Sequence, residues 1–88
     1  GIVTVNVNEL PIPDNQTLDT CINQAVSGTL TATAGVPPYT FTLDVGPTNG
    51  TLTAPINPVT GTFTYTPNLN FIGSDSFTFV VTDSNGCI

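Results

Sequence analysis

Two thiols, Cys21 and Cys87, are the most reactive side chains of this chain, which has no histidine and no lysine. Two cysteines without histidine and without a Cys-x-x-Cys pair cannot build an ordinary zinc site. A nucleophilic thiolate needs a neighbouring base, and neither cysteine has one. Two cysteines in a small, threonine-rich chain are typical of an oxidised extracellular protein. We therefore expect a disulfide between Cys21 and Cys87, worth roughly 4 kcal/mol in the chain-entropy model.

The other ionisable side chains are six carboxylates, which give a formal charge of −6 because lysine, arginine and histidine are absent. Such a chain cannot displace the counterions of phosphates, so nucleic acid is excluded as a partner, and so is attraction to an anionic membrane surface. Proton transfer near neutral pH lacks a histidine or lysine, so we expect no catalytic residues and no enzyme activity. The carboxylates are Glu9, Asp14, Asp19, Asp44, Asp75 and Asp83.

Strands must position these groups, because apolar residues alternate with threonine and other polar residues at a period of two. Stretches rich in proline, glycine and asparagine separate the alternating segments. The length of 88 residues suits one domain with a modest core. We predict an all-β fold, an antiparallel two-sheet sandwich of about seven strands, with no run that could cross a membrane. The predicted inward-facing sets are Val3, Val5 and Val7; Val26, Gly28, Leu30 and Ala32; Tyr39, Phe41, Leu43 and Val45; Phe63 and Tyr65; and Phe77, Phe79 and Val81.

The two ends of the chain carry strand signals without partners. The strand predicted at residues 77–82 is followed by Ser84-Asn85-Gly86, a turn that should lead into an antiparallel strand. The strand predicted at residues 2–8 has no hairpin partner before it. A bare edge of aromatic and valine residues is a template for aggregation, so proteins cover such edges. We infer that a strand of the 2–8 type covers residues 77–82, and that the chain is one period of a tandem or polymeric array.

Several motifs resemble a known family. They are Asn49-Gly50-Thr51-Leu52-Thr53, Gly61-Thr62-Phe63-Thr64-Tyr65-Thr66-Pro67, Phe71-Ile72-Gly73-Ser74-Asp75-Ser76-Phe77-Thr78-Phe79 and Val81-Thr82-Asp83-Ser84-Asn85-Gly86. Together they resemble the immunoglobulin-like (cadherin-like) tandem repeats of large bacterial surface adhesins. Gly35-Val36-Pro37-Pro38-Tyr39-Thr40-Phe41, with the two cysteines, is similar to the Cys-containing repeats of gliding-motility adhesins.

This resemblance implies an immunoglobulin-like sandwich in an extracellular or cell-surface protein. In such repeats the turn at residues 82–86 is normally followed by a last strand rich in threonine and valine, which here is found at residues 2–8. The resemblance also implies calcium as a candidate cofactor, because related repeats often bind it between domains. Surface solubility is the simpler explanation of the acidic residues, and no EF-hand-type loop is present. The candidate calcium ligands are Glu9, Asp14, Asp19, Asp75 and Asp83.

Three arrangements would cover the edge of residues 77–82. The N-terminal strand could fold back into its own domain, it could complete the preceding copy in a continuous chain, or it could enter a separate subunit. A conventional first strand is a fourth possibility. We favour completion of a neighbour, with residues 1–8 as the exchanged strand, residues 9–13 as a proline-stiffened linker and residues 14–88 as the immunoglobulin-like repeat. The predicted strand-exchange residues are Ile2, Val3, Val5, Val7, Phe77, Phe79 and Val81.

The function expected from these features is that of an extracellular structural repeat of an adhesin or fibre, whose partners are copies of itself. The alternative is a calcium- or carbohydrate-binding module of a secreted multidomain protein. Sugar binding would require Tyr39 and Phe71 to be exposed on one face, since the other aromatic residues share the inward parity of their strands.

Overall fold

The computed structural model describes residues 1–88, and all of its regular secondary structure is β. Neighbouring strands are antiparallel throughout. The structure contains no helix that is long and apolar enough to cross a membrane. The strands are β1 (Ile12–Pro13), β2 (Val26–Thr29), β3 (Ala32–Thr33), β4 (Thr40–Val45), β5 (Gly50–Ala54), β6 (Thr62–Pro67) and β7 (Thr78–Thr82). The predicted all-β sandwich is confirmed.

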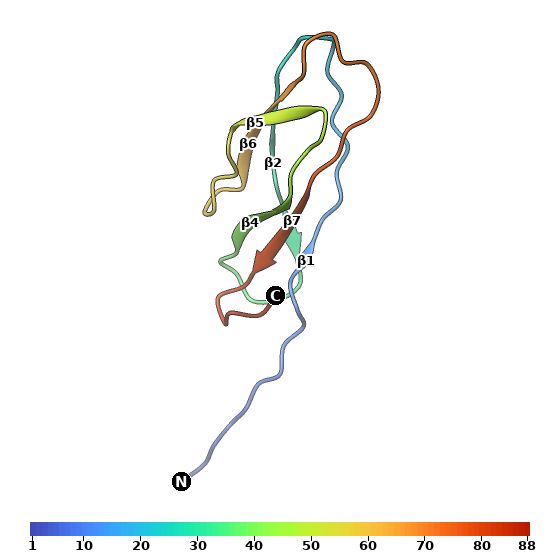
Figure 1. Ribbon diagram of the computed structural model, residues 1–88. Coiled ribbons are helices and arrows are strands. Elements are labelled where there is room, and N and C mark those ends of the chain that lie inside the picture. Colours follow the sequence, from blue (N-terminus) through green and yellow to red (C-terminus); the bar gives the residue numbers. More distant parts are fainter.

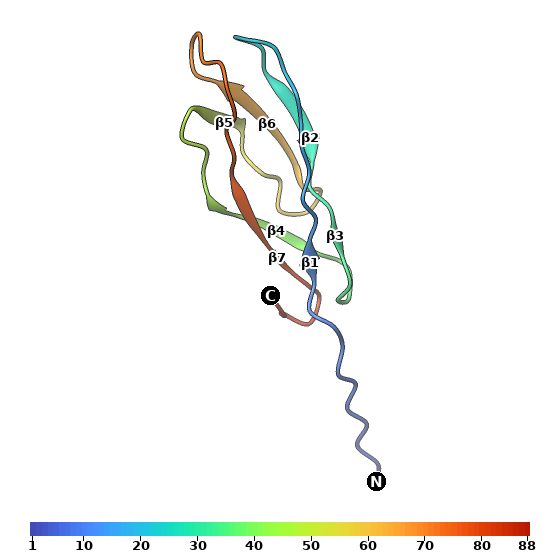
Figure 2. The same ribbon diagram turned by 90° about the vertical axis from the view of Figure 1, so that its right-hand side faces the viewer.

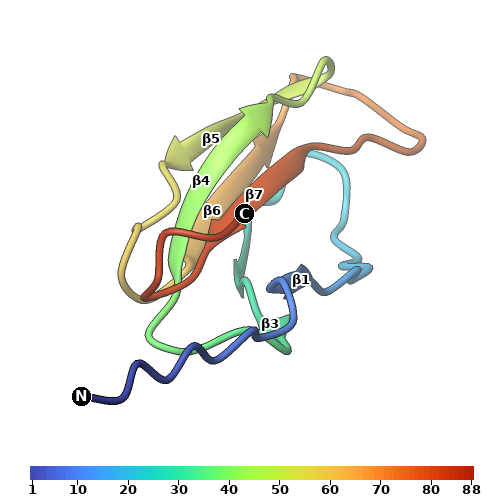
Figure 3. The same cartoon turned by 90° about the horizontal axis from the view of Figure 1, so that it is seen from below.

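The strands form two layers (Figures 1 and 2). In one layer β6 lies between β2 and β5, and β3 continues β2 and pairs with β1. The predicted strand at 26–32 is interrupted at Leu30 and Thr31, and the Leu30 N–H donates to the carbonyl of Gly61, the residue before β6 (2.8 Å). The other layer has only β4 and β7, paired with Phe41 opposite Val81 and Leu43 opposite Phe79. Viewed from below, β4 lies on one side of β7 and the β1–β3 pair lies beyond the other (Figure 3).

The core is small and each layer contributes two side chains to it. Leu30 and Phe63 come from the first layer, and Phe41 and Val81 from the second. The Phe63 and Phe77 rings meet edge to face at 5.1 Å between centroids, an arrangement that aromatic pairs prefer. Only 7 of the 88 residues are buried. A sandwich with one two-stranded layer therefore leaves much of its apolar surface uncovered.

Outward-facing threonines cover the solvated face of the first layer, as the alternation predicts. Ser27 and Thr64 hydroxyls lie 2.9 Å apart across β2 and β6, and Thr53 and Thr66 hydroxyls lie 3.0 Å apart across β5 and β6. Hydroxyl pairs of this kind add modestly to the stability of a sheet. The opposite face of the layer packs against the core.

Two expectations need correction. Leu43 and Val45 are exposed, because the register of β4 shifts between them and nothing covers that end of the strand. The predicted linker at 9–13 ends earlier than expected: Pro11 is buried, and Ile12–Pro13 form β1 against Thr33 and Ala32. Proline is tolerated there because β1 is an edge strand, where a missing N–H costs no ladder bond.

Residues 1–10, which we call the tail, are exposed along their whole length and belong to no strand. The tail leaves the body at the end where the C-terminus lies and continues away from it along the long axis (Figures 1 and 2). Ile2, Val3, Val5 and Val7 are 94%, 91%, 77% and 93% exposed. The strand predicted at residues 2–8 is thus extended chain without a partner within its own copy.

Candidate strand-acceptor groove

The free edge of β7 presents unpaired backbone groups. Phe41 N–H donates to the Pro58 carbonyl (3.0 Å), so it points away from β7. Phe41 and its opposite residue Val81 therefore form a non-hydrogen-bonded pair, in which both backbones direct their N–H and C=O groups outward. By the period of two, Phe79 directs its backbone to the same free edge. An extended segment lying beside β7 would find these groups ready to pair.

A hollow of about 860 Å³ lies beside this edge, between the β7 side of the molecule and the segment 14–22. We call it the acceptor groove. Phe63 and Leu30 from the first layer contribute to its lining, and Cys21 and Gly73 line it as well. Further apolar side chains in the lining are Leu18, Ile22, Val26, Phe71, Phe77 and Phe79. The groove thus joins an open sheet edge to an apolar interior, which is the combination a missing strand would fill.

The turn that follows β7 is held by Asp83, which is buried. Its carboxylate accepts N–H bonds from Val36 (3.2 Å), Asn85 (2.9 Å) and Cys87 (3.0 Å). Its own N–H donates to the Cys87 carbonyl (2.9 Å). Burial alone would raise the pKa of Asp83, but these hydrogen bonds outweigh it and lower the pKa below its ordinary value. Asp83 therefore fixes residues 83–87 as a rigid turn that brings the chain back alongside β7.

Asp75 organises the opposite end in a similar way. Its carboxylate accepts bonds from the Tyr65 hydroxyl (2.8 Å) and from the N–H groups of Asn49 (3.0 Å) and Ser76 (2.8 Å). Burial opposes and hydrogen bonding favours the charged form, and the net effect is a lowered pKa of Asp75. Burial, the bond to Asp75 and its charge raise the pKa of Tyr65 to about 12. A Cβ at Gly50 would lie 2.5 Å from the Tyr65 ring, so only glycine allows the ring this position.

The predicted calcium ligands are not brought together in one copy. No group of three or more potential metal ligands converges anywhere in residues 1–88. Asp75 and Asp83 use their oxygens on the N–H and O–H donors described above, and Asp14 accepts hydrogen bonds from Thr31 (2.9 Å) and Thr33 (3.2 Å). Glu9 lies on the exposed tail. A calcium ion at a junction between copies therefore stays a prediction.

No disulfide joins Cys21 to Cys87 in this structure, and both thiols are free. The turn around Cys21 lies next to Asn70, because Asn23 exchanges two side-chain hydrogen bonds with that residue. Cys87 lies in the Asp83 turn at the other end of the body (Figure 1). We refer to these as the Cys21 end and the Cys87 end.

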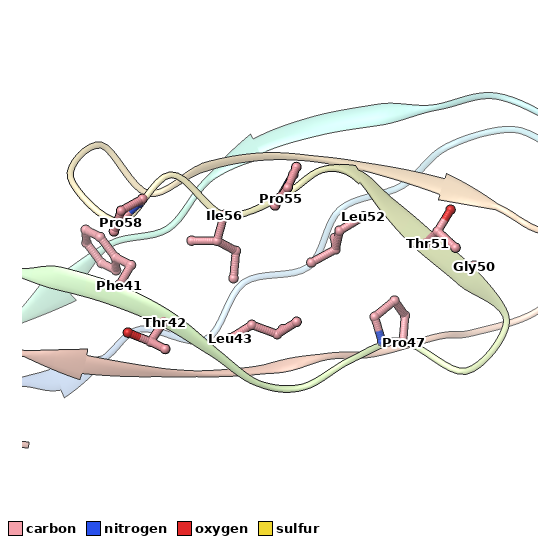
Figure 4. A pocket seen from close by; sticks show the side chains of 10 residues that line it. All are labelled: Phe41, Thr42, Leu43, Pro47, Gly50, Thr51, Leu52, Pro55, Ile56 and Pro58. Atoms are coloured by element: carbon pink, nitrogen blue, oxygen red, sulfur yellow. The ribbon is translucent and has the colours of Figure 1, made fainter.

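A second hollow, of about 620 Å³, lies at the opposite side of the sandwich between β4 and β5 (Figure 4). The loop carrying Pro55, Ile56 and Pro58 borders it, and the bond from Phe41 N–H to the Pro58 carbonyl occupies part of the free edge of β4. The chain's own loop therefore partly covers this side. On the β7 side, β1 lies close to β7 but does not pair with it, so the backbone edge of β7 stays open.

The arrangement required for a sugar platform is not present. Tyr39 packs edge to face on Phe41 (6.4 Å between centroids), and its hydroxyl donates to the Ala34 carbonyl (2.6 Å). Phe71 lines the acceptor groove near Asn68, to which its N–H donates (3.0 Å). The two rings are half-buried and belong to different parts of the molecule.

Of the predicted strand-exchange residues, the structure places Phe77 and Phe79 in the groove lining and Val81 in the core beside it. It leaves the four tail residues apart from them. Sequence reasoning missed Leu18 and Ile22 as one wall of the groove. The available signal was two isolated apolar residues in an otherwise polar stretch, which shows no periodicity.

Comparison with protein families agrees with this architecture, since the family model described as the bacterial Ig domain matches residues 8–88. Searches of curated proteins and of solved structures gave no match. Such domains are common in surface proteins and are typically structural modules without enzyme activity. The match covers the whole folded body, and the chain therefore belongs to the bacterial Ig domain family.

Proposed function

We propose that this chain is an extracellular structural repeat of a fibre or adhesin, in which residues 1–8 of one copy fill the acceptor groove of the preceding copy. The observation that carries the proposal is the match between two unpaired features: an exposed tail with valine at every second position and an open β7 edge beside an apolar groove. Strand addition of this kind satisfies the edge backbone and buries alternate side chains. The family, whose members are common in surface proteins, favours the extracellular setting.

The Asp83 turn supports a specific register. Its bond from Asp83 N–H to the Cys87 carbonyl begins an antiparallel ladder on the free edge of β7. If the ladder continues from Ile88 into Gly1 of the next copy, Val3 falls opposite Phe79 and Val5 opposite Phe77. Directly opposed residues of an antiparallel pair share a face, so both valines point into the groove. A slip of one residue would turn Ile2, Thr4 and Asn6 inward instead.

The direction of the tail favours a neighbour over the chain's own groove. The strand required by the Asp83 turn runs antiparallel to β7, from the Cys87 end to the Cys21 end. The tail enters its own body at the Cys87 end, where Pro11 is packed against Gly35. A Cβ at Gly35, whose φ is +64°, would lie 3.0 Å from the Pro11 backbone, so this contact fixes the entry point. Folding back from there would make the tail parallel to β7 and would break the ladder begun by the turn.

The same geometry supports head-to-tail assembly. The tail approaches its own body along the long axis with the polarity that the exchanged strand needs in the preceding copy (Figure 2). Each copy therefore donates a strand at one end and accepts one in its groove. An interface between two different patches that does not close on itself generates an open filament.

Removal of residues 1–8 tests this proposal. The full chain should sediment as a concentration-dependent series of oligomers, and the shortened chain should be monomeric while keeping the circular dichroism of a β protein. The shortened chain still has a groove, so it should bind one free tail and shorten the assemblies formed by the full chain. A chain with residues 1–8 replaced by glycine and serine controls for length. Oligomers of the shortened chain, or a full chain that stays monomeric at all concentrations, would contradict the proposal.

A further inference from the structure

The two free thiols stand at opposite ends of one copy, each close to a place where the proposed assembly brings two copies together. Cys21 lines the acceptor groove at the same end as Ile72, Gly73 and Ser74. Cys87 lies in the turn fixed by Asp83 at the end where the tail leaves the body. Within one copy the length of the folded body separates them (Figure 1). A bridge between them therefore requires a second copy.

We propose that Cys21 of one copy forms a disulfide with Cys87 of the following copy, an inference that rests on the proposed strand complementation. If Gly1 of the following copy continues the ladder directly after Ile88, Glu9 of the following copy lies opposite Gly73 of the preceding one. Gly73 is three residues from Asn70, which is hydrogen-bonded to Asn23 in the turn that contains Cys21. The exchanged strand thus leaves the groove beside Cys21.

Only Leu10 separates that exit point from the next folded body. An extended chain advances at most about 3.6 Å per residue, so Glu9 and Pro11 are no more than roughly 7 Å apart. Pro11 is packed on Gly35, the neighbouring Val36 N–H donates to the Asp83 carboxylate (3.2 Å), and that carboxylate also accepts the Cys87 N–H (3.0 Å). The Cys21 end of one copy is therefore brought next to the Cys87 end of the following copy. The head-to-tail polarity places unlike cysteines at each junction and keeps like cysteines apart.

Bond formation requires an electron acceptor, and a small-molecule disulfide such as oxidised glutathione supplies it. One cysteine thiolate attacks the glutathione disulfide and releases one glutathione thiolate, which leaves a mixed disulfide on the protein. The second cysteine thiolate then displaces the other glutathione. The products are one Cys21–Cys87 disulfide and two reduced glutathione molecules, which take up the two protons. Each covalent link would make the corresponding strand exchange permanent.

The test uses the full chain and separates assembly from oxidation. Assembly is first measured by sedimentation under reducing conditions, and oxidised glutathione is then added before non-reducing electrophoresis in detergent. We expect a ladder of monomer multiples that collapses to monomer with dithiothreitol. Neither Cys21→Ser nor Cys87→Ser alone should give a ladder, whereas their equimolar mixture should give a covalent dimer and nothing larger. Because the chain has no trypsin site, a protease that cleaves before aspartate is used, and it should release peptide 19–43 linked to peptide 83–88.

Each other outcome has a defined meaning. Oligomers under reducing conditions with no ladder, or with only a bridged monomer, would overturn the disulfide and leave strand complementation standing. Covalent dimers from either single variant would show that the thiols meet by random collision and would overturn the proposed disulfide. A ladder from a Val3→Asn chain, at concentrations where that chain is monomeric, would do the same. A full chain that never assembles would overturn the proposed function and the disulfide together.

Discussion

The substitution Val3→Asn tests which alternate side chains of the exchanged strand point into the groove. Val3 is 91% exposed in the free chain and would be buried opposite Phe79 in the assembly. Burying a valine side chain contributes about 1.5–3 kcal/mol. Asparagine forfeits that contribution and places an unpaired amide in the groove, at a cost of about 1–3 kcal/mol. The sum is roughly 2.5–6 kcal/mol, which corresponds to a rise of about 10²–10⁴-fold in the dissociation constant between copies.

Ile2→Asn is the matched control, because Ile2 is the adjacent residue, is also β-branched and is 94% exposed. In the proposed register Ile2 points to solvent, and a surface substitution changes the free energy by no more than about 0.5 kcal/mol. Sedimentation velocity over a range of concentrations under reducing conditions gives the dissociation constant of each chain. Equal losses in the two variants would refute the pairing of the tail with β7, and a larger loss for Ile2→Asn would show a register slipped by one residue.

Two further predictions concern the groove edge and the Asp75 contacts. On assembly, the amides of Phe79 and Val81 should become protected from hydrogen exchange, whereas the Leu43 amide on the free edge of β4 should not; protection at Leu43 alone would place the strand on the wrong edge. Asp75→Ala should lower the free energy of unfolding in urea by about 1.5–3 kcal/mol, because charged hydrogen bonds are lost, whereas Asp44→Ala, which loses one bond of 3.3 Å to Thr78, should change it by less than about 0.5 kcal/mol. The pKa of Asp75 is lowered from 3.8 in the folded state, so the stability that its charge contributes is present above that value and is lost as the pH falls through the lower folded-state pKa. Asp75→Ala should therefore make the free energy of unfolding fall less steeply below pH 3.8. An unchanged pH dependence in that range would contradict the role of its charge.

Strands with strong alternation were predictable from the sequence, because side-chain parity follows directly from the pleat. The alternating runs around Phe41, Phe63 and Phe79 became β4, β6 and β7. The two-residue strand β1 was not predictable, since its Pro-x-Pro sequence indicates a loop, and only its edge position makes it compatible with pairing. The exposure of Val45 also depends on a register shift that no local pattern encodes.

The candidate site was also predictable from the sequence only in part. Phe77 and Phe79 could be assigned to an open edge from parity and from the turn that follows them, but Leu18 lies in a polar segment whose course across the body is set by tertiary contacts. Leu18 approaches Gly28 so closely that a Cβ there would lie 2.7 Å from its methyl group, a relation between residues ten apart in sequence with no local signal. The two cysteines are likewise evident in the sequence, whereas their positions at opposite ends follow only from the fold.

The sparse core ties the stability of a copy to its assembly. One layer of the sandwich has two strands, and only four apolar side chains form the buried cluster. An exchanged strand would add a third strand to that layer and cover Phe77 and Phe79, which are half-exposed in a single copy. A partner that binds only the folded state raises its stability in proportion to the logarithm of its free concentration. In a filament, each groove would be supplied with a strand by the adjoining copy, so the fold of every internal repeat would be completed by its neighbour.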